Sequence, residues 1–199
     1  MDILSHGLWA GAAAKGINIK KEKKINVWLA TFWGTFPDLF AFTIPFVWLF
    51  GNLTSGNVSF SDIHPPTGDE PERKVFFGNG NARQADSFIS YLTSTLYSIS
   101  HSAVIFFLII GLVILLKKNF LNKNNGQIVP WEMGGWLLHI FLDVPTHSYA
   151  FYPTPVFWPL TEWKFQGFSW ANPTFMLFNY LAIIIAYLLI RYFQKRKLL

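Results

Sequence analysis

The sequence predicts an all-α integral membrane protein, a bundle of helices embedded in a bilayer. Of its 199 residues, 52% are hydrophobic and only 14% are charged. Long apolar runs, of which residues 103–116 are the clearest example, alternate with short polar connectors. This composition is typical of membrane proteins, and the short connectors favour a single domain over residues 1–199, with an outer loop at about 51–87.

The main expected elements are four apolar segments, each close to the ~20 residues that a helix needs to cross a bilayer. They cover approximately residues 25–50, 88–116, 131–151 and 173–190. Before them, residues 3–19 form a shorter apolar stretch rich in Gly and Ala. The expected bundle therefore has four spans plus an N-terminal short or re-entrant helix, with five spans as the alternative.

The distribution of basic residues predicts the orientation. Residues 15–24, residues 117–130 and the C-terminal tail together contain 12 Lys and Arg residues. The connectors at residues 51–87 and 152–172 together contain 4. Cytoplasmic loops of membrane proteins are enriched in Lys and Arg. We therefore expect a multi-pass protein of the cell (inner) membrane, with the loop at residues 15–24 and the C-terminus in the cytoplasm.

The available residue types limit the partners and cofactors. The net charge is +5, but the lysines cluster beside apolar runs and no nucleic-acid-binding motif accompanies them. We expect contact with anionic membrane lipids and none with nucleic acid, and no oligomeric state is predicted. Because Cys is absent, a bound metal ion must take nitrogen and oxygen ligands from His, Asp or Glu.

Ionisable side chains inside the expected helices are the strongest functional signal. An uncompensated Asp at mid-membrane costs about 2.5 to 3.5 kcal/mol, and such residues usually face the bundle interior and mark function. Counted at ~1.5 Å per residue along their segments, those in this chain reach overlapping depths in the bilayer. A structural hydrogen bond explains one such residue equally well, but a shared cation better explains six: His6, Asp38, His101, His139, Asp143 and His147.

Helical spacing groups three of these residues. His139 and Asp143 are four residues apart and lie on one face of a helix, so both can point at one ion. His147 would follow on that face, and Pro145 disturbs the helix in a way that lets His147 turn toward the same point. Imidazole and carboxylate ligands suit a divalent metal ion, Zn²⁺ first, with Mn²⁺ or Fe²⁺ as alternatives.

Four short motifs, in this order, resemble the membrane-bound metal-dependent hydrolase family, which includes a LexA-regulated inner-membrane protein. They are SHGLWAG, FPD, SISHS, and HIFLDVPTH followed by FYPTPVFWPL. The resemblance implies a metal site at His6, Asp38, His101, His139 and Asp143. Members of this family commonly contain the motif Pro-Asp-x-Asp-His. In this chain Pro37-Asp38-Leu39 is followed by Phe40 and Ala41, so the second Asp and the His of the motif are missing. The missing carboxylate would reduce two metals to one or weaken binding, and His147 is a candidate replacement.

The predicted function is hydrolysis of an ester or phosphoester bond in a lipid or lipid-linked substrate through metal-activated water, with a phosphoester favoured. In this interpretation Asp143 and His147 are catalytic, His147 being either a further ligand or an acid/base partner. The metal ligands are His6, Asp38, His101, His139 and Asp143. The alternative is an ion or proton-coupled transporter, or a non-catalytic membrane protein, that uses the same His/Asp cluster.

Overall fold

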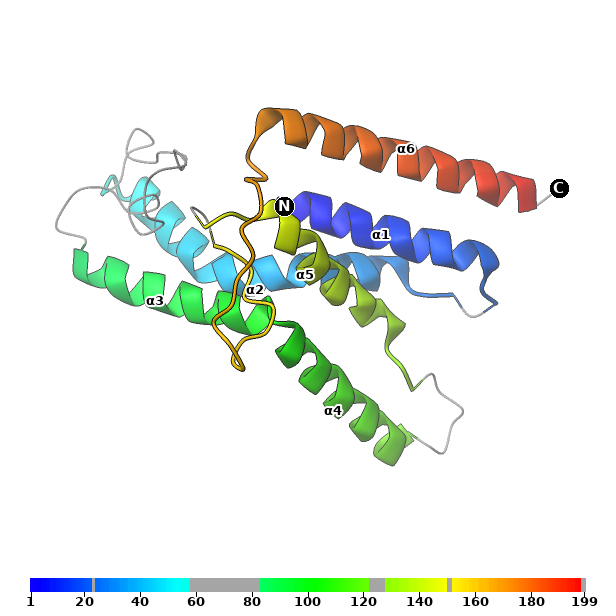
Figure 1. The fold of residues 1–199 in the computed structure, drawn as a ribbon, viewed down its shortest axis with the longest axis horizontal. Coiled ribbons are helices and arrows are strands. Elements are labelled where there is room, and N and C mark those ends of the chain that lie inside the picture. The colour runs from blue at the N-terminus through cyan, green and yellow to red at the C-terminus, as the bar shows by residue number, and fades with distance from the viewer. Residues whose placement is uncertain (23, 58–82, 122–127, 150–151, 198–199) are drawn as a thin grey trace.

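The computed structural model describes all residues except 23, 58–82, 122–127, 150–151 and 198–199 (Figure 1). Most of the predicted outer loop at 51–87 therefore lies outside the described residues. Within the described part, the chain is helical, which confirms the all-α class. The elements are α1 (Ile3–Lys20), α2 (Val27–Thr54), α3 (Arg83–Ser100), α4 (Ala103–Leu121), a 3₁₀ turn (Trp131–Met133), α5 (Gly134–Thr146) and α6 (Pro173–Lys197).

The first two helices begin at side-chain caps that the sequence supplies. The Asp2 carboxylate accepts a hydrogen bond from the backbone N–H of Ser5 at 3.0 Å. The Asn26 side chain accepts one from the backbone N–H of Leu29 at 3.1 Å. Such caps satisfy backbone donors that the first turn of a helix leaves free. Helix α1 therefore starts at Ile3, which fixes the position of His6 one turn later.

Helices α1, α2 and α5 cross at close range because glycines face the contacts. A Cβ atom on Gly34 of α2 would lie 2.5 Å from the Ala10 Cβ and 2.9 Å from the His6 carbonyl oxygen of α1. A Cβ atom on Gly135 of α5 would collide with the carbonyl oxygen of Ala30. Small residues allow helix backbones to approach closely in membranes. This packing places three helices around one central point.

The expected span at 88–116 is two helices joined at a bend. The segments Phe88–Ser100 and Ala103–Asn119 meet at 61°. The side chain of Ser102 accepts from the backbone N–H of Ile105 at 3.3 Å, so it caps the start of α4. The bend places residue His101 at the tip of a corner that points into the bundle, where it is fully buried.

Helix α5 is shorter than the predicted span at 131–151. It covers only Gly134–Thr146, 13 residues, or about 20 Å at ~1.5 Å per residue, against a hydrocarbon core of about 30 Å. It ends at His147, which has extended backbone angles. The structure therefore does not confirm four spans. The described residues contain two helices long and apolar enough to cross a membrane, α2 and α6, or three if the bent pair is counted as one span.

The connector that follows α5 folds back over the end of that helix. The backbone N–H of Gly167 donates to the carbonyl oxygen of His147 at 2.9 Å, and that of Ala103 donates to the carbonyl oxygen of Val156 at 2.9 Å. The connector thus ties the bend between α3 and α4 to the end of α5. Its exposed aromatic side chains include Phe157, Trp163 and Phe168.

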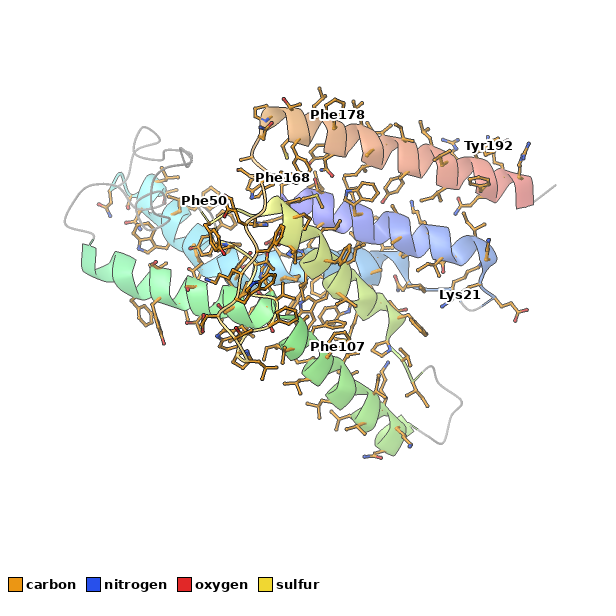
Figure 2. The ribbon with its side chains drawn as sticks, viewed as in Figure 1. Lys21, Phe50, Phe107, Phe168, Phe178 and Tyr192 are labelled. Atoms are coloured by element: carbon orange, nitrogen blue, oxygen red, sulfur yellow. The ribbon has the colours of Figure 1, made fainter. Side chains whose placement is uncertain are left out.

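The outer faces of the helices are apolar. Phe50, Phe107 and Phe178, on α2, α4 and α6, point away from the bundle (Figure 2). Large exposed apolar surfaces of this kind are expected of helices that face lipid. The C-terminal ends of α1 and α6 lie at the same end of the molecule (Figure 1), as the predicted orientation requires, although the orientation itself stays a prediction.

Candidate metal centre

Helices α1, α2 and α5, together with the bend between α3 and α4, bring the six ionisable residues together. His6 comes from α1, Asp38 from α2, and His101 from the bend between α3 and α4. His139 and Asp143 lie one turn apart on α5, as their spacing predicts, and His147 caps the end of that helix. All six are buried, and His101 and Asp143 are 0% exposed. The predicted convergence of these side chains is therefore present.

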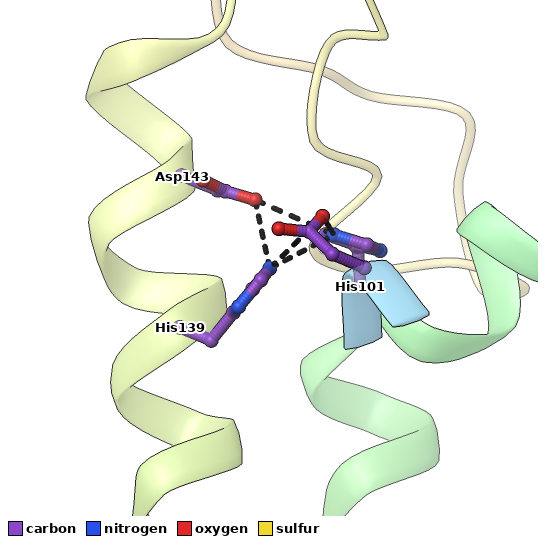
Figure 3. A group of neighbouring side chains, drawn as sticks. His101, His139 and Asp143 are labelled. Atoms are coloured by element: carbon purple, nitrogen blue, oxygen red, sulfur yellow. Dashed lines mark hydrogen bonds and ion pairs between the residues drawn. The ribbon is translucent and has the colours of Figure 1, made fainter. Parts of the chain in front are cut away.

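Four of them form a compact tetrad. One ligand atom from each of Asp38, His101, His139 and Asp143 lies within 4.8 Å of all the others. The Nε2 atoms of His101 and His139 are 3.0 Å apart. Both point toward the carboxylate of Asp143, where Oδ2 is 3.4 Å from His101 and 3.1 Å from His139 (Figure 3).

The separations in the tetrad match those of a tetrahedral metal site. Bonds of about 2.0 to 2.1 Å to a tetrahedral zinc ion place the ligand atoms about 3.4 Å from one another. The Asp38 Oδ1 atom is 3.4 Å from the His101 Nε2 and 3.7 Å from the His139 Nε2. With the contacts of Asp143, the known separations run from 3.0 to 3.7 Å. These separations are compatible with an ion between the four side chains.

The outer nitrogens of the two imidazoles fix which nitrogen faces the centre. Nδ1 of His139 lies 2.7 Å from the carbonyl oxygen of Gly34, and Nδ1 of His101 lies 3.1 Å from that of Tyr97. A carbonyl oxygen only accepts, so each Nδ1 carries the hydrogen. In the neutral rings, each Nε2 then presents a lone pair to the centre. Metal-binding histidines are oriented in this way in proteins.

Two carboxylate oxygens in the centre lack hydrogen-bond donors. Oδ2 of Asp38 and Oδ2 of Asp143 are buried and have no hydrogen-bond partner within the described part of the chain. Buried charges of this kind are costly unless paired or bound to a metal. The Nε2 lone pairs of His101 and His139 face each other at 3.0 Å and repel. Either a proton shared between them or a bound cation would remove this repulsion. The tetrahedral separations of four donor atoms favour the cation.

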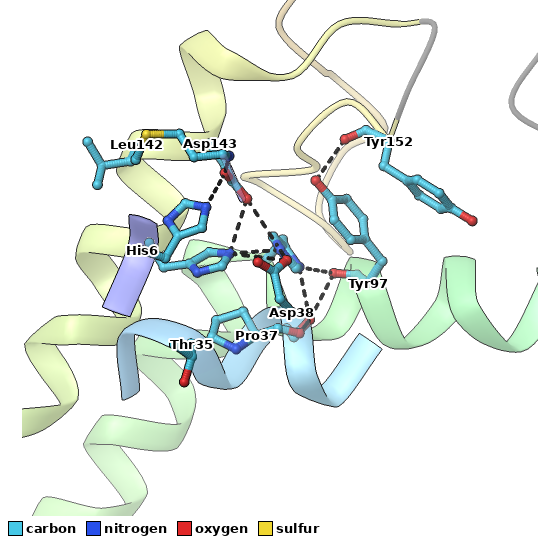
Figure 4. Close-up of polar contacts among 12 residues, drawn as sticks. His6, Thr35, Pro37, Asp38, Tyr97, Leu142, Asp143 and Tyr152 are labelled. Carbon is cyan, nitrogen blue, oxygen red and sulfur yellow. Dashed lines mark hydrogen bonds and ion pairs between the residues drawn. The ribbon is translucent and has the colours of Figure 1, made fainter. Parts of the chain in front are cut away.

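The remaining histidines gather on the other oxygen of Asp143. The His6 Nε2 lies 2.8 Å from Asp143 Oδ1 (Figure 4). The His147 Nδ1 lies 3.3 Å from the same atom. The Met1 amino group also forms an ion pair with Oδ1. Asp143 therefore faces two sets of groups, one through each carboxylate oxygen.

A polar network holds α1 against α6 next to the centre. Asn179 donates from its side chain to the Ser5 hydroxyl at 2.7 Å and accepts from the Trp9 indole N–H at 2.9 Å. The Tyr180 hydroxyl donates to the Asp2 carboxylate at 2.9 Å. Ser5 precedes His6, so this network fixes the turn of α1 that carries the imidazole.

Sequence reasoning missed two groups that orient the site, the Asn179 side chain and the Gly34 carbonyl, both of which are uncharged. For Ser100, which flanks His101, the sequence predicts a role in supporting that residue or in packing between helices, and its hydroxyl lies 2.9 Å from the His101 Nδ1. Asn179 lies in an otherwise apolar span, and an amide there is itself a signal because a polar side chain in lipid needs a partner. The Gly34 carbonyl left no signal, since every residue carries one. The roles of the six residues as ligands or catalysts stay predictions.

The profile of the YdjM inner membrane protein family matches residues 1–198 of this chain. The chain belongs to this family. Membership in the YdjM family confirms the predicted inner-membrane location, with two to three candidate spans. The expectation that the chain belongs to a family of membrane proteins is therefore confirmed. The structure adds that the chain contains a buried His/Asp cluster that could hold a metal ion. Neither the curated proteins nor the solved structures contain a match to the chain.

Proposed function

We propose that this YdjM family protein is a metal-dependent hydrolase that cleaves an ester or phosphoester bond in a lipid or lipid-linked substrate. The observation that supports the proposal most strongly is the arrangement of His101 and His139, whose Nε2 atoms are 3.0 Å apart. Each is oriented by a backbone carbonyl on its far side. Together with Asp38 and Asp143, they supply four donors to one buried point.

The residues present fit a divalent ion of the Zn²⁺, Mn²⁺ or Fe²⁺ type. Their nitrogen and oxygen atoms match the ligand preferences of these ions, and Zn²⁺ is favoured by the tetrahedral spacing. Such an ion, when bound, activates water near neutral pH and polarises the oxygen of the bond to be cleaved. A phosphoester is favoured over a carboxylic ester because mixed His/Asp sites are the usual machinery for phosphoester hydrolysis.

The side chains themselves orient the site and manage its protons. The carbonyl oxygens of Gly34 and Tyr97 hold the rings of His139 and His101 in place. His147, 3.3 Å from Asp143 Oδ1, is positioned either to accept the proton that water gives up or to bind an ion. Burial of the cluster keeps bulk water away and strengthens every charge interaction in it.

The location of the centre supports an amphiphilic substrate. The tetrad lies among helices whose outer faces are apolar. The connector after α5, which carries exposed aromatic side chains, is hydrogen-bonded to the bend at His101 through Ala103 and Val156. A site inside the membrane meets molecules that diffuse in the plane of the bilayer. The substrate class follows from this location and not from a recognition residue.

Metal content and lipid hydrolysis measured on the same samples test the proposal. The full chain, purified in detergent, is assayed for phosphatase and esterase activity on mixed lipids. We expect metal-dependent turnover in the wild type, a loss of at least tenfold in His139→Ala and Asp38→Ala, and no loss in Phe141→Ala. Phe141 lies on α5, the helix of His139, but is 73% exposed. Bound metal without turnover on any lipid, together with ion flux in liposomes, would contradict hydrolysis and favour ion transport.

A further inference from the structure

A tyrosine side chain lies against the imidazole of His101. The rings of Tyr97 and His101 are stacked, with centroids 3.8 Å apart and an interplanar angle of 22°. The backbone N–H of His101 donates to the Tyr97 carbonyl oxygen at 2.9 Å, so the helical turn of α3 continues to His101. Residues four apart on a helix share a face. This spacing brings the two rings together, and Tyr97 is 3% exposed.

Hydrogen bonds restrain one atom of the His101 ring and leave its plane free. Nδ1 lies 3.1 Å from the Tyr97 carbonyl oxygen and 2.9 Å from the Ser100 hydroxyl. A ring held at a single atom can still tilt about that atom. A metal ligand must keep its direction to within about 10–20° of the productive geometry. The stacked face of Tyr97 restricts the tilt, which aims Nε2 at the tetrad.

The Tyr97 ring is itself held through its hydroxyl. The hydroxyl donates to the carbonyl oxygen of Tyr152, in the connector after α5, at 2.7 Å (Figure 4). Tyr152 has a φ of 41°, a left-handed conformation that residues other than glycine rarely adopt. Residues in such conformations persist only where their surroundings hold them, and they gather at functional sites. The Tyr97 hydroxyl is one of the contacts that hold this residue.

The connector is attached to the chain on both sides of His101. The first attachment is made by Tyr97, four residues before His101. The second is made by Ala103, two residues after it, whose backbone N–H donates to the carbonyl oxygen of Val156 at 2.9 Å. Two prolines lie between the attached connector residues, and they limit the backbone conformations of this segment. The connector therefore gives Tyr97 a restricted backbone to rest on.

We propose that Tyr97 is a positioning residue of the metal centre, whose ring sets the plane of the His101 imidazole and whose hydroxyl keeps that ring in place. Tyr97 acts through His101 and is not assigned as a ligand. The other imidazole of the tetrad has a comparable support, because the ring of His6 stacks on that of His139 with centroids 3.6 Å apart. The inference rests on the proposed function and deepens it, because it names a residue that controls metal affinity without contacting the ion.

Three substitutions separate the ring from the hydroxyl. Tyr97→Leu removes both, Tyr97→Phe removes the hydroxyl alone, and Tyr91→Leu makes the same change at an exposed position of α3. The full chain in detergent is titrated with Zn²⁺ in competition with a fluorescent chelator. We expect Tyr97→Leu to lose at least tenfold in zinc affinity, as for other groups that orient a ligand. We expect a smaller loss in Tyr97→Phe and none in Tyr91→Leu. Equal affinity in Tyr97→Leu and Tyr91→Leu, or equal losses in the two Tyr97 variants, overturns the role of the ring.

The metal-free protein supplies a readout that a folding defect does not mimic. In a chain with ¹³C-labelled histidine, the ring current of Tyr97 should move the His101 ring protons upfield in the NMR spectrum, and His101→Gln identifies the signal. We expect this shift in the wild type, Tyr97→Phe and Tyr91→Leu. Tyr97→Leu should lose it, while the His6 signal, shifted by the stack on His139, stays in place.

The two measurements distinguish failure of this inference from failure of the proposed function. An unshifted His101 signal in the wild type, or an unchanged one in Tyr97→Leu, overturns the stacking. Zinc binding with unchanged affinity in Tyr97→Leu overturns this inference alone. A wild type that binds no zinc although His101 is stacked overturns the metal-dependent function, and it leaves Tyr97 as the support of the His101 ring.

Discussion

Nδ1 of His139 donates a hydrogen bond to the backbone carbonyl of Gly34 at 2.7 Å, which ties the ring on α5 to the backbone of α2. The contact exists because α2 has no side chain at this position, so that α1 and α5 both come close to it. One glycine therefore controls both the helix packing and the orientation of the His139 ring. The structure and the proposed chemistry depend on the same close crossing.

Enlarging Gly34 should damage the centre and the fold together. The added Cβ in Gly34→Ala would lie 2.5 Å from the Ala10 Cβ, so α1 must shift away from α2. We expect a loss of about 1 to 3 kcal/mol in stability, the usual cost of overpacking, and weaker zinc binding. Thermal unfolding and zinc titration measure the two effects.

Gly111→Ala is the matched control for this change. A Cβ atom at Gly111, on α4, meets nothing within 4 Å. Because Ala is the better helix former by roughly 1 kcal/mol, this variant should keep or slightly raise stability and bind zinc normally. Equal zinc affinity in Gly34→Ala and Gly111→Ala would contradict the role given to the helix crossing.

Removing the Ser100 hydroxyl should weaken metal binding without unfolding the protein. This hydroxyl lies 2.9 Å from Nδ1 of His101 and 3.1 Å from the Pro37 carbonyl oxygen. Groups that orient a ligand in this way contribute about 10- to 100-fold to metal affinity. We expect Ser100→Ala to lower zinc affinity by at least tenfold, and Ser94→Ala, at an exposed position of the same helix, to leave it unchanged. Competition with a fluorescent chelator measures both affinities.

Cutting the polar link between α6 and α1 should loosen the turn that carries His6. Asn179→Leu removes the hydrogen bonds to Ser5 and Trp9. Hydrogen bonds between membrane helices contribute about 0.6 to 2 kcal/mol each, so the expected loss is about 1 to 3 kcal/mol. Thermal unfolding in detergent measures it, with Leu177→Ala, an exposed neighbour on α6, as the control. Unchanged stability in Asn179→Leu would show that α6 docks by apolar packing alone.

The orientation of the chain can be tested by labelling cysteines in intact cells, since the protein contains none of its own. Ser169, in the connector after α5, and Lys20, the last residue of α1, are both exposed. The charge distribution assigns them to opposite sides of the membrane. We expect a membrane-impermeant maleimide to label Ser169→Cys and to leave Lys20→Cys unlabelled until the cells are broken. The reverse pattern would invert the topology.

The sequence predicted the members of the cluster better than the helices that carry them. His139 and Asp143 were placed together by their spacing of one helical turn, which depends only on helix geometry. His101 was placed by depth along a straight span, yet it sits at a 61° bend. Hydropathy does not reveal such a bend, because both helices of the pair are apolar enough to be read as one span.

The shortness of α5 was missed for a related reason. The segment at 131–151 is mostly apolar, but the helix stops at Thr146 and the chain turns extended at His147. Pro145 indicated that the helix is disturbed near its end. It did not indicate that the backbone of His147 would then pair with Gly167, 20 residues further along the chain. Long-range backbone contacts of this kind depend on the tertiary fold, which no local pattern encodes.

If the proposed ion is bound, its removal should destabilise the protein, since the ion would neutralise the carboxylates of Asp38 and Asp143. A ligand present at 100 times its dissociation constant stabilises the folded state by about 2.7 kcal/mol. We expect the melting temperature to fall on treatment with a chelator and to recover on addition of Zn²⁺. In Asp38→Asn, which weakens the site, the chelator should have a smaller effect. An unchanged melting temperature in the wild type would mean that no ion contributes to the fold.

The most direct test of the account is the metal content of the purified wild-type protein compared with that of Asp143→Ala. Asp143 contacts both sets of imidazoles, so its loss should empty the whole cluster. The account predicts stoichiometric divalent metal in the wild type and in Phe141→Ala, and almost none in Asp143→Ala. A metal-free wild type after incubation with Zn²⁺, or equal metal in Asp143→Ala, would contradict it.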